Sequence, residues 1–99
     1  MYAVVNQVRI QPGKADEGLG IWHSRVVPSL KQQRGFKGLV LLLNREENRG
    51  MSVLLWQSEA DLQAAMDTDF AARMQELLQP VLAGPPERGK YEVIIHEDL

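Results

Sequence analysis

The amino-acid sequence predicts a single α+β domain in which strands and helices follow one another as βαββαβ. Three patterns carry this prediction. Apolar and polar residues alternate near the start of the chain, two later segments show the apolar spacing of amphipathic helices, and two apolar runs in the middle are separated by a polar loop. A chain of 99 residues has the length of one domain, and we assign residues 1–99 to it.

The composition is that of an ordinary globular protein and excludes several functions. Hydrophobic residues make up 44% of the chain and charged residues 24%, which is not the composition of a disordered protein. The chain has no Cys, which excludes disulfides, zinc–thiolate sites and thiol nucleophiles. A formal net charge of -2 gives no electrostatic footprint for nucleic acid or an anionic membrane. We find neither a secretory signal pattern nor an apolar run of transmembrane length, and expect a cytoplasmic protein.

The first two expected elements are a strand and a helix. In Tyr2–Ile10 the even-numbered side chains share one face and the odd-numbered ones the other, which is the period of a β-strand. Pro12 ends this strand. Residues Lys14–Gln33 then place apolar side chains at helical spacing. Because Pro28 cannot donate a backbone hydrogen bond, we expect it to kink this helix or to end it near Val27.

A β-hairpin is predicted in the centre of the chain. Gly35–Gly38 is expected to form a turn, and Leu39–Leu43 is a continuous apolar strand. The polar loop Asn44–Gly50 connects it to a returning strand, Met51–Trp56. Since both strands contain apolar residues in succession, they are expected to be covered on both faces.

The second helical segment is expected to begin at Ser58. Ser58 and Asp61 have the spacing of a capping box, in which each residue satisfies the other's backbone at the start of a helix. Asp67 and Thr68 are residue types that favour the N-cap position, and they predict that the helix breaks and restarts there. Pro80 is expected to end the segment.

The end of the chain is predicted to supply the fourth strand. Ala83–Gly89 is rich in Gly and Pro and is expected to be a loop. Tyr91–His96 contains an apolar run and is expected to be the strand. The complete order is that of the ferredoxin-like fold, with a four-stranded antiparallel sheet.

Both faces of the expected sheet are apolar. Two helices cover only one face, yet the runs Leu39–Leu43, Val53–Leu55 and Val93–Ile95 place apolar side chains on both. One alternative is that the loops of the chain fold back over the second face, which their shortness disfavours. A second copy packed sheet against sheet would cover it, so we expect a homodimer.

Two polar side chains on expected inner surfaces are candidates for chemistry. Asn6 is the polar exception on the even-numbered face of the first strand. It is either satisfied by neighbouring backbone or buried water, or it orients a substrate oxygen in a cavity. His23 is expected on the inward stripe of the first helix, where it is a general base, a metal or haem ligand, or a boundary histidine that packs its ring edge. His96, followed by acidic residues, is expected at the surface or at the dimer rim.

Large apolar side chains are expected to form the wall of any cavity between sheet and helices. Met and aromatic residues at helical spacing are most often core residues. If a cavity exists, the same side chains make it apolar and suited to a flat aromatic ligand. The predicted wall consists of Trp22, Trp56, Met66, Phe70 and Met74.

Several short motifs resemble the antibiotic biosynthesis monooxygenase domain. They are the Gln11–Lys14 turn, the Gly35–Gly38 turn and the Trp56–Glu59 junction, within the same order of elements. The resemblance covers nearly the whole chain and implies the fold of the dimeric α+β barrel superfamily. Members of the family include cofactor-free oxygenases of anthrones and quinols, haem-degrading monooxygenases, and small proteins without an assigned activity. The resemblance also implies that an Asn on a strand, here Asn6, lines the cavity.

The haem-degrading branch of this family fits the sequence poorly. That branch has an Asn on the first strand, a Trp in the second helix and a His further along that helix as the iron ligand. Asn6 matches the first position, but Ala65 and Met74 stand at the other two. We therefore expect no haem, no other cofactor and no metal site.

Three functions of different classes remain open. In the first, the chain is a cofactor-independent monooxygenase that deprotonates a quinol or anthrone-like substrate to a carbanion, which reacts directly with O2. Asn6 would orient and stabilise the substrate oxygen, and His23 would be the base. In the second, the chain is a stress-related or ligand-binding protein that holds a small hydrophobic molecule without turnover. The third is a purely structural module, in which both polar residues are simply satisfied.

Overall fold

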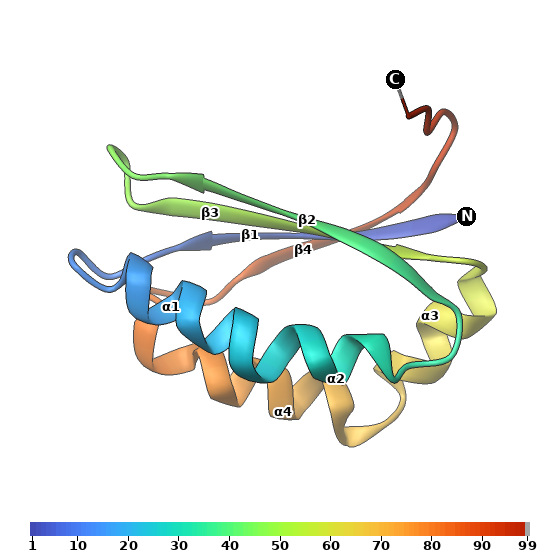
Figure 1. The fold of residues 1–99 in the computed structure, drawn as a ribbon, viewed down its shortest axis with the longest axis horizontal. Helices are drawn as coiled ribbons and strands as arrows, with labels where there is room; N and C mark the ends of the chain where they lie inside the picture. The colour runs from blue at the N-terminus through green and yellow to red at the C-terminus, as the bar shows by residue number, and fades with distance from the viewer. Residues whose placement is uncertain (99) are drawn as a thin grey trace.

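The computed structural model describes residues 1–98 and confirms the predicted order of strands and helices. A twisted sheet forms one layer, and the helices form a second layer that covers one of its faces (Figure 1). The strands are β1 (Tyr2–Arg9), β2 (Phe36–Asn44), β3 (Arg49–Trp56) and β4 (Glu87–Glu92). The helices are α1 (Ala15–Ile21), α2 (Val27–Lys31), α3 (Glu59–Met66) and α4 (Asp69–Leu78), with a π-helical segment η1 (Trp22–Val26) and a 3-10 turn η2 (Gln79–Val81).

The four-stranded sheet has the order β2-β3-β1-β4, and all neighbouring strands are antiparallel. Val4 of β1 lies opposite Leu54 of β3, which lies opposite Leu39 of β2. These three side chains belong to the core or pack against it. The even-numbered face predicted for the first strand is therefore the inner face of the sheet, which meets the helices.

Of the two outcomes expected at Pro28, a kink or an end of the helix, the end does not occur, because the first helical segment continues through α1, η1 and α2 to Lys31. The backbone widens into a π turn just before the proline, where the amide of Val27 donates to the carbonyl of Trp22, five residues earlier. A wider turn relieves the clash between a proline ring and the carbonyl four residues before it. The expected end of the helix is thus replaced by a π segment, an irregularity that is frequent at functional sites.

Both predicted N-caps of the second helical segment are confirmed, but in the capping box the carboxylate of Asp61 accepts from the hydroxyl of Ser58 in place of its backbone amide. Ser58 Oγ accepts a hydrogen bond from the backbone amide of Asp61 at 3.1 Å and donates to the carboxylate of Asp61 at 3.0 Å. The helix breaks at Asp67, and Thr68 Oγ1 accepts from the backbone amide of Phe70 at 3.2 Å. The break separates α3 from α4 and lets α4 run beside α1 beneath the sheet (Figure 1).

The last strand lies earlier in the sequence than predicted. β4 pairs with β1 over Glu87–Glu92, so the predicted loop over Ala83–Gly89 is wrong for Glu87–Gly89, and of the predicted strand Tyr91–His96 only Tyr91 and Glu92 lie in β4. An edge strand needs little apolar sequence because solvent reaches one of its sides. The wrong prediction came from the apolar run that begins at Val93. The amide of Val93 donates one more hydrogen bond, to the carbonyl of Met1 at 2.9 Å, and the chain then leaves the sheet (Figure 1).

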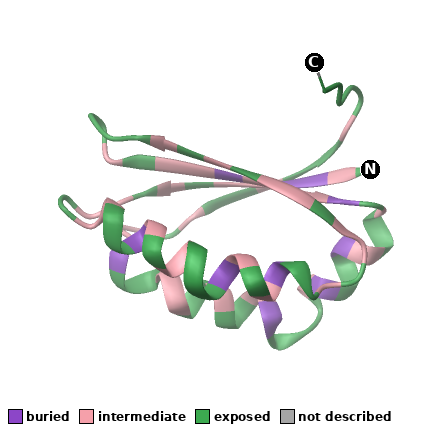
Figure 2. Ribbon diagram, viewed as in Figure 1, coloured by how far each residue is buried: buried purple, intermediate pink, exposed green. Residues whose placement is uncertain are grey.

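The hydrophobic core lies between the inner face of the sheet and the helices, and Figure 2 shows buried positions in both layers. Trp56 is among the largest fully buried side chains, and its ring packs edge-to-face against Phe36 with the centroids 5.4 Å apart. Within residues 1–98, no helix is long and apolar enough to cross a membrane. The buried members of the core are Val4, Val26, Leu30, Trp56, Leu62, Ala65 and Phe70.

The outer face of the sheet carries apolar side chains that no helix covers. Val40 and Leu42 of β2 are each 49% exposed, and Tyr91 of β4 is 56% exposed. In the C-terminal segment, Ile94 and Ile95 are each 78% exposed. The apolar second face expected from the sequence is present, and the homodimer inferred from it stays a prediction.

Candidate active site

A cavity of about 200 Å³ lies between the inner face of the sheet and the helices. All four strands and all of the helical segments contribute to its lining, and most of the lining is apolar. An apolar cavity of about 150 Å³ is large enough to hold benzene. The present cavity therefore has room for a small aromatic molecule, and since it is smaller than the roughly 300 Å³ at which drug-sized pockets begin, it favours a compact ring system.

The structure brings the five predicted wall residues together in this lining. Trp22 comes from η1, Trp56 from β3, Met66 from α3, and Phe70 and Met74 from α4. Phe70 and Met74 are four residues apart, so they share the face of α4 that meets the sheet. Trp56 and Phe70 are buried, whereas the other three are half-buried. The wall residues thus also serve as core, as Met and aromatic residues at this spacing usually do.

Three polar side chains lie next to one another on the neighbouring strands β3, β1 and β4, in one cross-strand row of the sheet. Asn6 of β1 is in register with Ser52 of β3 on one side and with Arg88 of β4 on the other. Asn6 Nδ2 donates to Ser52 Oγ at 3.4 Å, and Arg88 Nε donates to Asn6 Oδ1 at 3.1 Å. All three residues line the cavity, and we call them the polar corner. Asn6 therefore has protein partners and also borders a cavity.

The guanidinium of Arg88 determines how the amide of Asn6 is oriented. A guanidinium has donors but no acceptor, so Asn6 must turn its carbonyl oxygen toward Arg88. The amide nitrogen then lies on the side of Ser52, to which it donates at 3.4 Å. Because an amide nitrogen carries two hydrogens, it retains one further donor for another acceptor.

Arg88 and Ser52 are site residues that the sequence reasoning missed. Arg88 was expected in a loop, and Ser52, which is 5% exposed, gives no signal as a single Ser in an apolar strand. The register of β1 with both of its neighbours is the signal that finds them, because it places both beside Asn6. That register becomes visible only when Glu87–Glu92 is recognised as the edge strand.

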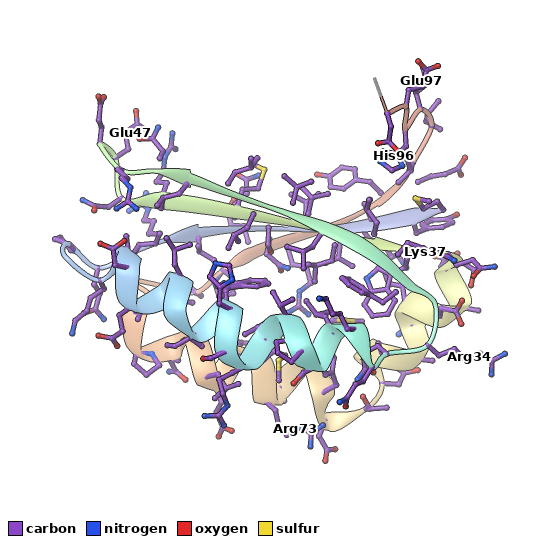
Figure 3. The ribbon with its side chains drawn as sticks, viewed as in Figure 1. Arg34, Lys37, Glu47, Arg73, His96 and Glu97 are labelled. Carbon is purple, nitrogen blue, oxygen red and sulfur yellow. The ribbon has the colours of Figure 1, made fainter. Side chains whose placement is uncertain are left out.

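Arg88 is the only charged residue in the cavity lining over the described part of the chain. Figure 3 shows labelled charged side chains that lie away from the space between the layers: Glu47 at the tip of the β2–β3 hairpin and Arg73 on the far side of α4. Among residues 1–98, no Asp or Glu lines the cavity. The cavity thus carries one positive charge within a chain whose formal net charge is -2.

Lys90 shows how a second cation on the same strand is held elsewhere. It lies two residues after Arg88 on the same face of β4 but is not part of the cavity lining. Its Nζ is 2.9 Å from Glu59 Oε2 at the start of α3. The hydrogen bond to Glu59, together with the charge of this carboxylate, raises the pKa of Lys90 above its ordinary value. Lys90 is therefore partnered with a carboxylate, whereas none of the ion pairs within residues 1–98 involves Arg88.

His23 is exposed and is not part of the cavity lining, so its predicted inward position is wrong. The predicted apolar stripe included His23, but the sheet covers a narrower face of the helix. In η1 the inward positions belong to Trp22 and Val26, which both line the cavity and are four residues apart. His96 is exposed in the C-terminal segment (Figure 3), where the sequence placed it at the surface or the dimer rim.

Solved structures with the same fold cover nearly all of the chain. A mutant of SnoaB from Streptomyces nogalater, described as a cofactor-independent oxygenase, is similar with a TM-score of 0.79 and 18% identity over 96% of this chain and 94% of that one. A protein from Caulobacter crescentus is similar with a TM-score of 0.78 and 21% identity over 95% and 90% of the two chains. A conserved protein from Methanosarcina mazei Go1 gives 0.76 and 19% over 91% and 89%. These likenesses show a shared fold.

The sequence itself identifies the family. No curated protein sequence matches the chain. Residues 1–79, which run from β1 through α4 and include Asn6, Ser52 and all five wall residues, match the family described as Antibiotic biosynthesis monooxygenase. The match confirms the resemblance found in the turns and junctions of the sequence. The chain belongs to the antibiotic biosynthesis monooxygenase family.

Proposed function

We propose that the protein is a cofactor-independent monooxygenase that acts on a small aromatic substrate of the quinol or anthrone type. The observation that carries this proposal is a cavity of about 200 Å³ with an apolar wall and one polar corner. A flat ring suits the wall, and a ring oxygen suits the polar corner. Membership of the family supports the proposal, and so does the likeness to SnoaB, which is described as a cofactor-independent oxygenase.

The proposed reaction needs no external electron donor, because the substrate supplies the electrons. At an anthrone-type methylene, loss of a proton gives a carbanion whose charge is delocalised onto the ring oxygen. The carbanion adds O2 and takes up a proton, which gives a hydroperoxide that loses water to leave a ketone. One oxygen atom enters the substrate and the other leaves as water, while the methylene carbon supplies all of the electrons that reduce O2.

Asn6 has the role of binding the oxygen on which negative charge develops. Its amide nitrogen retains one N–H beyond the bond to Ser52 Oγ. A donor that is already oriented stabilises a developing anion more than the neutral substrate, and it needs no reorganisation during the reaction. Arg88 Nε, which donates to Asn6 Oδ1, supports this role by holding the amide in place.

No side chain with the usual chemistry of a general base lines the cavity in residues 1–98. The lining there contains no His, Asp, Glu, Lys or Tyr, and His23 lies outside it. The proposal therefore assigns removal of the proton to water or hydroxide. The contribution of the protein is to stabilise the resulting anion, which lowers the pKa of the bound substrate.

Oxygen uptake with a panel of quinols and anthrones tests the proposal. The wild-type protein is expected to consume O2 and to release the ketone or quinone. Asn6→Ala is expected to lower kcat by about 10²- to 10³-fold, the usual effect of removing one donor to a developing oxyanion. The control is Gln7→Ala, because the neighbouring side chain points to the other face of the sheet and does not line the cavity. No uptake with any substrate, or full activity of Asn6→Ala, would contradict the proposal.

A second candidate is binding of a small hydrophobic ligand without turnover. The lack of a general base in the described cavity lining favours it. The outcome that distinguishes it is saturable binding of an aromatic ligand by a protein that consumes no O2 with the same ring system. A purely structural role predicts no binding at all, and a cavity of about 200 Å³ is an argument against it.

We also propose that two chains pair through the outer faces of their sheets. Val40 and Leu42 on β2 and Tyr91 on β4 leave an apolar surface open. Exposed apolar patches of this kind are typical of protein interfaces, and a two-fold pair covers the same patch on both copies. Sedimentation at micromolar concentration is expected to give the mass of a dimer, and a monomer under these conditions would contradict this assignment.

A further inference from the structure

The polar corner contains a cation whose binding capacity is only partly used. Arg88 Nε donates to Asn6 Oδ1 at 3.1 Å, and this bond involves one of the five N–H groups of the guanidinium. The two terminal nitrogens make no hydrogen bond or ion pair within residues 1–98. Four donors of a permanent cation are thus available at the border of an apolar cavity.

The available end of Arg88 has the geometry of a carboxylate site. The guanidinium is planar, and its two terminal nitrogens form a fork that matches the two oxygens of a carboxylate with parallel hydrogen bonds. Asn6 occupies the Nε side, so the open side is the end between the terminal nitrogens. The contact with Asn6 also reduces the freedom of the side chain, which lowers the entropy that binding must overcome.

The charges around Arg88 favour an anionic ligand over a neutral one. No acidic residue lines the cavity in the described chain, so nothing within it neutralises the guanidinium. The next cation on the strand, Lys90, is paired with Glu59 at 2.9 Å and does not compete for a ligand. Because Arg88 is exposed on the edge strand, a carboxylate bound there keeps contact with water and avoids the full cost of burying a charge.

We propose that the substrate is an aromatic carboxylic acid, whose ring lies in the cavity and whose carboxylate binds the terminal nitrogens of Arg88. This inference rests on the proposed function for its site, but it names a group that the oxygenation chemistry does not require. Arg88 is then the residue that determines specificity, selecting an acidic aromatic molecule over a neutral one of the same shape. The apolar wall, including Trp22 and Trp56, binds the ring in either case.

Binding of two matched probes tests the inference without any oxidation. The probes are 2-naphthoate and 2-naphthamide, which share ring and shape and differ in charge. Trp22 and Trp56 both line the cavity, so their fluorescence reports binding. At pH 7.5 the wild-type protein is expected to bind the acid about tenfold more tightly than the amide, as for a charge-assisted pair that stays partly hydrated.

Three variants separate the role of Arg88 from general effects. Arg88→Gln is expected to abolish the preference for the acid, so that acid and amide bind with equal affinity, and measurable binding of the amide shows that the variant is folded. Arg88→Lys is expected to restore part of the preference, because an ammonium keeps the charge but not the fork. Lys90→Gln is the matched control, since it removes a charge from the same face of the same strand outside the cavity, and the preference is expected to persist.

The possible outcomes distinguish this inference from the proposed function. Equal affinity of the wild-type protein for acid and amide would overturn the inference, and so would a preference that survives in Arg88→Gln. Binding of neither probe would overturn both the inference and the proposed cavity site. A clear preference for the acid in a protein that consumes no O2 would support the inference and contradict the monooxygenase activity alone.

Discussion

The inner face of the sheet is covered by helices of the same chain, whereas the outer face is open to solvent (Figure 2). On the inner face, Val4 and Trp56 are 4% and 2% exposed. On the outer face, Val40 and Tyr91 are 49% and 56% exposed. Both faces are apolar, so hydrophobicity alone does not distinguish the side chains that are buried in the core from those that are left exposed.

Function is indicated by the residues that depart from the usual pattern of each face, namely uncovered apolar side chains on the outer face and polar side chains on the inner face. An apolar surface without cover indicates that something else covers it. A polar group on a covered face destabilises the fold unless it has hydrogen-bond partners. Asn6 has two such partners and also borders the cavity. We therefore propose a protein partner for the outer face and a small ligand for the inner face, and the variants described below test this division.

The largest expected effect is on the inner face. Trp56→Ala removes a side chain that is 2% exposed and packs against Phe36, so the free energy of unfolding is expected to fall by about 3–5 kcal/mol. Urea denaturation followed by circular dichroism measures it. The control is Gln57→Ala, because the next residue along is exposed and its loss is expected to cost less than about 0.5 kcal/mol. Similar losses for the two variants would remove the distinction between core and surface at this strand end.

The next effect is on the outer face and concerns assembly. Val40→Lys places a charge on the exposed apolar surface, and in a two-fold pair the two copies bring like charges into one interface, which costs several kcal/mol. Sedimentation is expected to show dissociation, with the circular dichroism spectrum of the folded chain retained. Ala72→Lys, on the exposed side of α4, is the control and is expected to leave the mass unchanged. A dimer that tolerates Val40→Lys would place its interface on another surface.

Local patterns in the sequence predicted the inner face well, because they depend on neighbours in the chain. Alternation over Tyr2–Ile10 placed Asn6 toward the helices, and the spacing from Ser58 to Asp61 identified a cap that the structure contains. Four of the five wall residues were found in the same way, since helical spacing determines which side chains share a face, whereas Trp56 was expected at the end of a strand. These features need no knowledge of how distant segments pair.

The parts that failed depend on pairing and on packing between layers. Arg88 lies 82 residues from Asn6 in the sequence, and only the register of β4 with β1 brings the two together. A polar edge strand gives no hydrophobic pattern, so the apolar run around Val93–Ile95 was predicted to be the strand instead. The position of His23 depended on the width of the covered helix face, which is set by the sheet and not by the helix sequence.

A smaller effect concerns the break that shapes the cavity. Thr68 Oγ1 accepts from the amide of Phe70 and donates to the carbonyl of Ala65, so Thr68→Ala is expected to cost about 1 kcal/mol of unfolding free energy. Because Met66 and Phe70 on either side of the break both line the cavity, weaker binding of 2-naphthamide is expected as well. Ser24→Ala is the control: Ser24 Oγ donates to the carbonyl of Gly20 within a helix, where such bonds contribute little.

The dependence of turnover on pH tests the assignment of proton removal to water or hydroxide. Below the pKa of the bound substrate, O2 uptake is expected to rise about tenfold for each pH unit, since the reactive species is the anion. A histidine base would instead give a rise that levels off above its own pKa near neutral pH. Measurement of kcat between pH 5 and 9 distinguishes the two, and a plateau beginning near pH 6.5 would contradict the assignment.

The smallest expected effect is that of His23→Ala. The side chain is exposed and lies outside the cavity lining, so the free energy of unfolding is expected to change by less than about 0.5 kcal/mol. The kcat, the KM and the shape of the pH profile are also expected to stay as in the wild-type protein, because no step assigned to the cavity involves this imidazole. The adjacent Trp22 does line the cavity, and Trp22→Ala is expected to weaken binding of both naphthalene probes equally. A lower kcat of His23→Ala, together with the loss of one limb of the pH profile, would contradict this expectation. The side chain would then reach the substrate from outside the described lining, and the division of this helix into a cavity-facing side and an exposed side would be wrong.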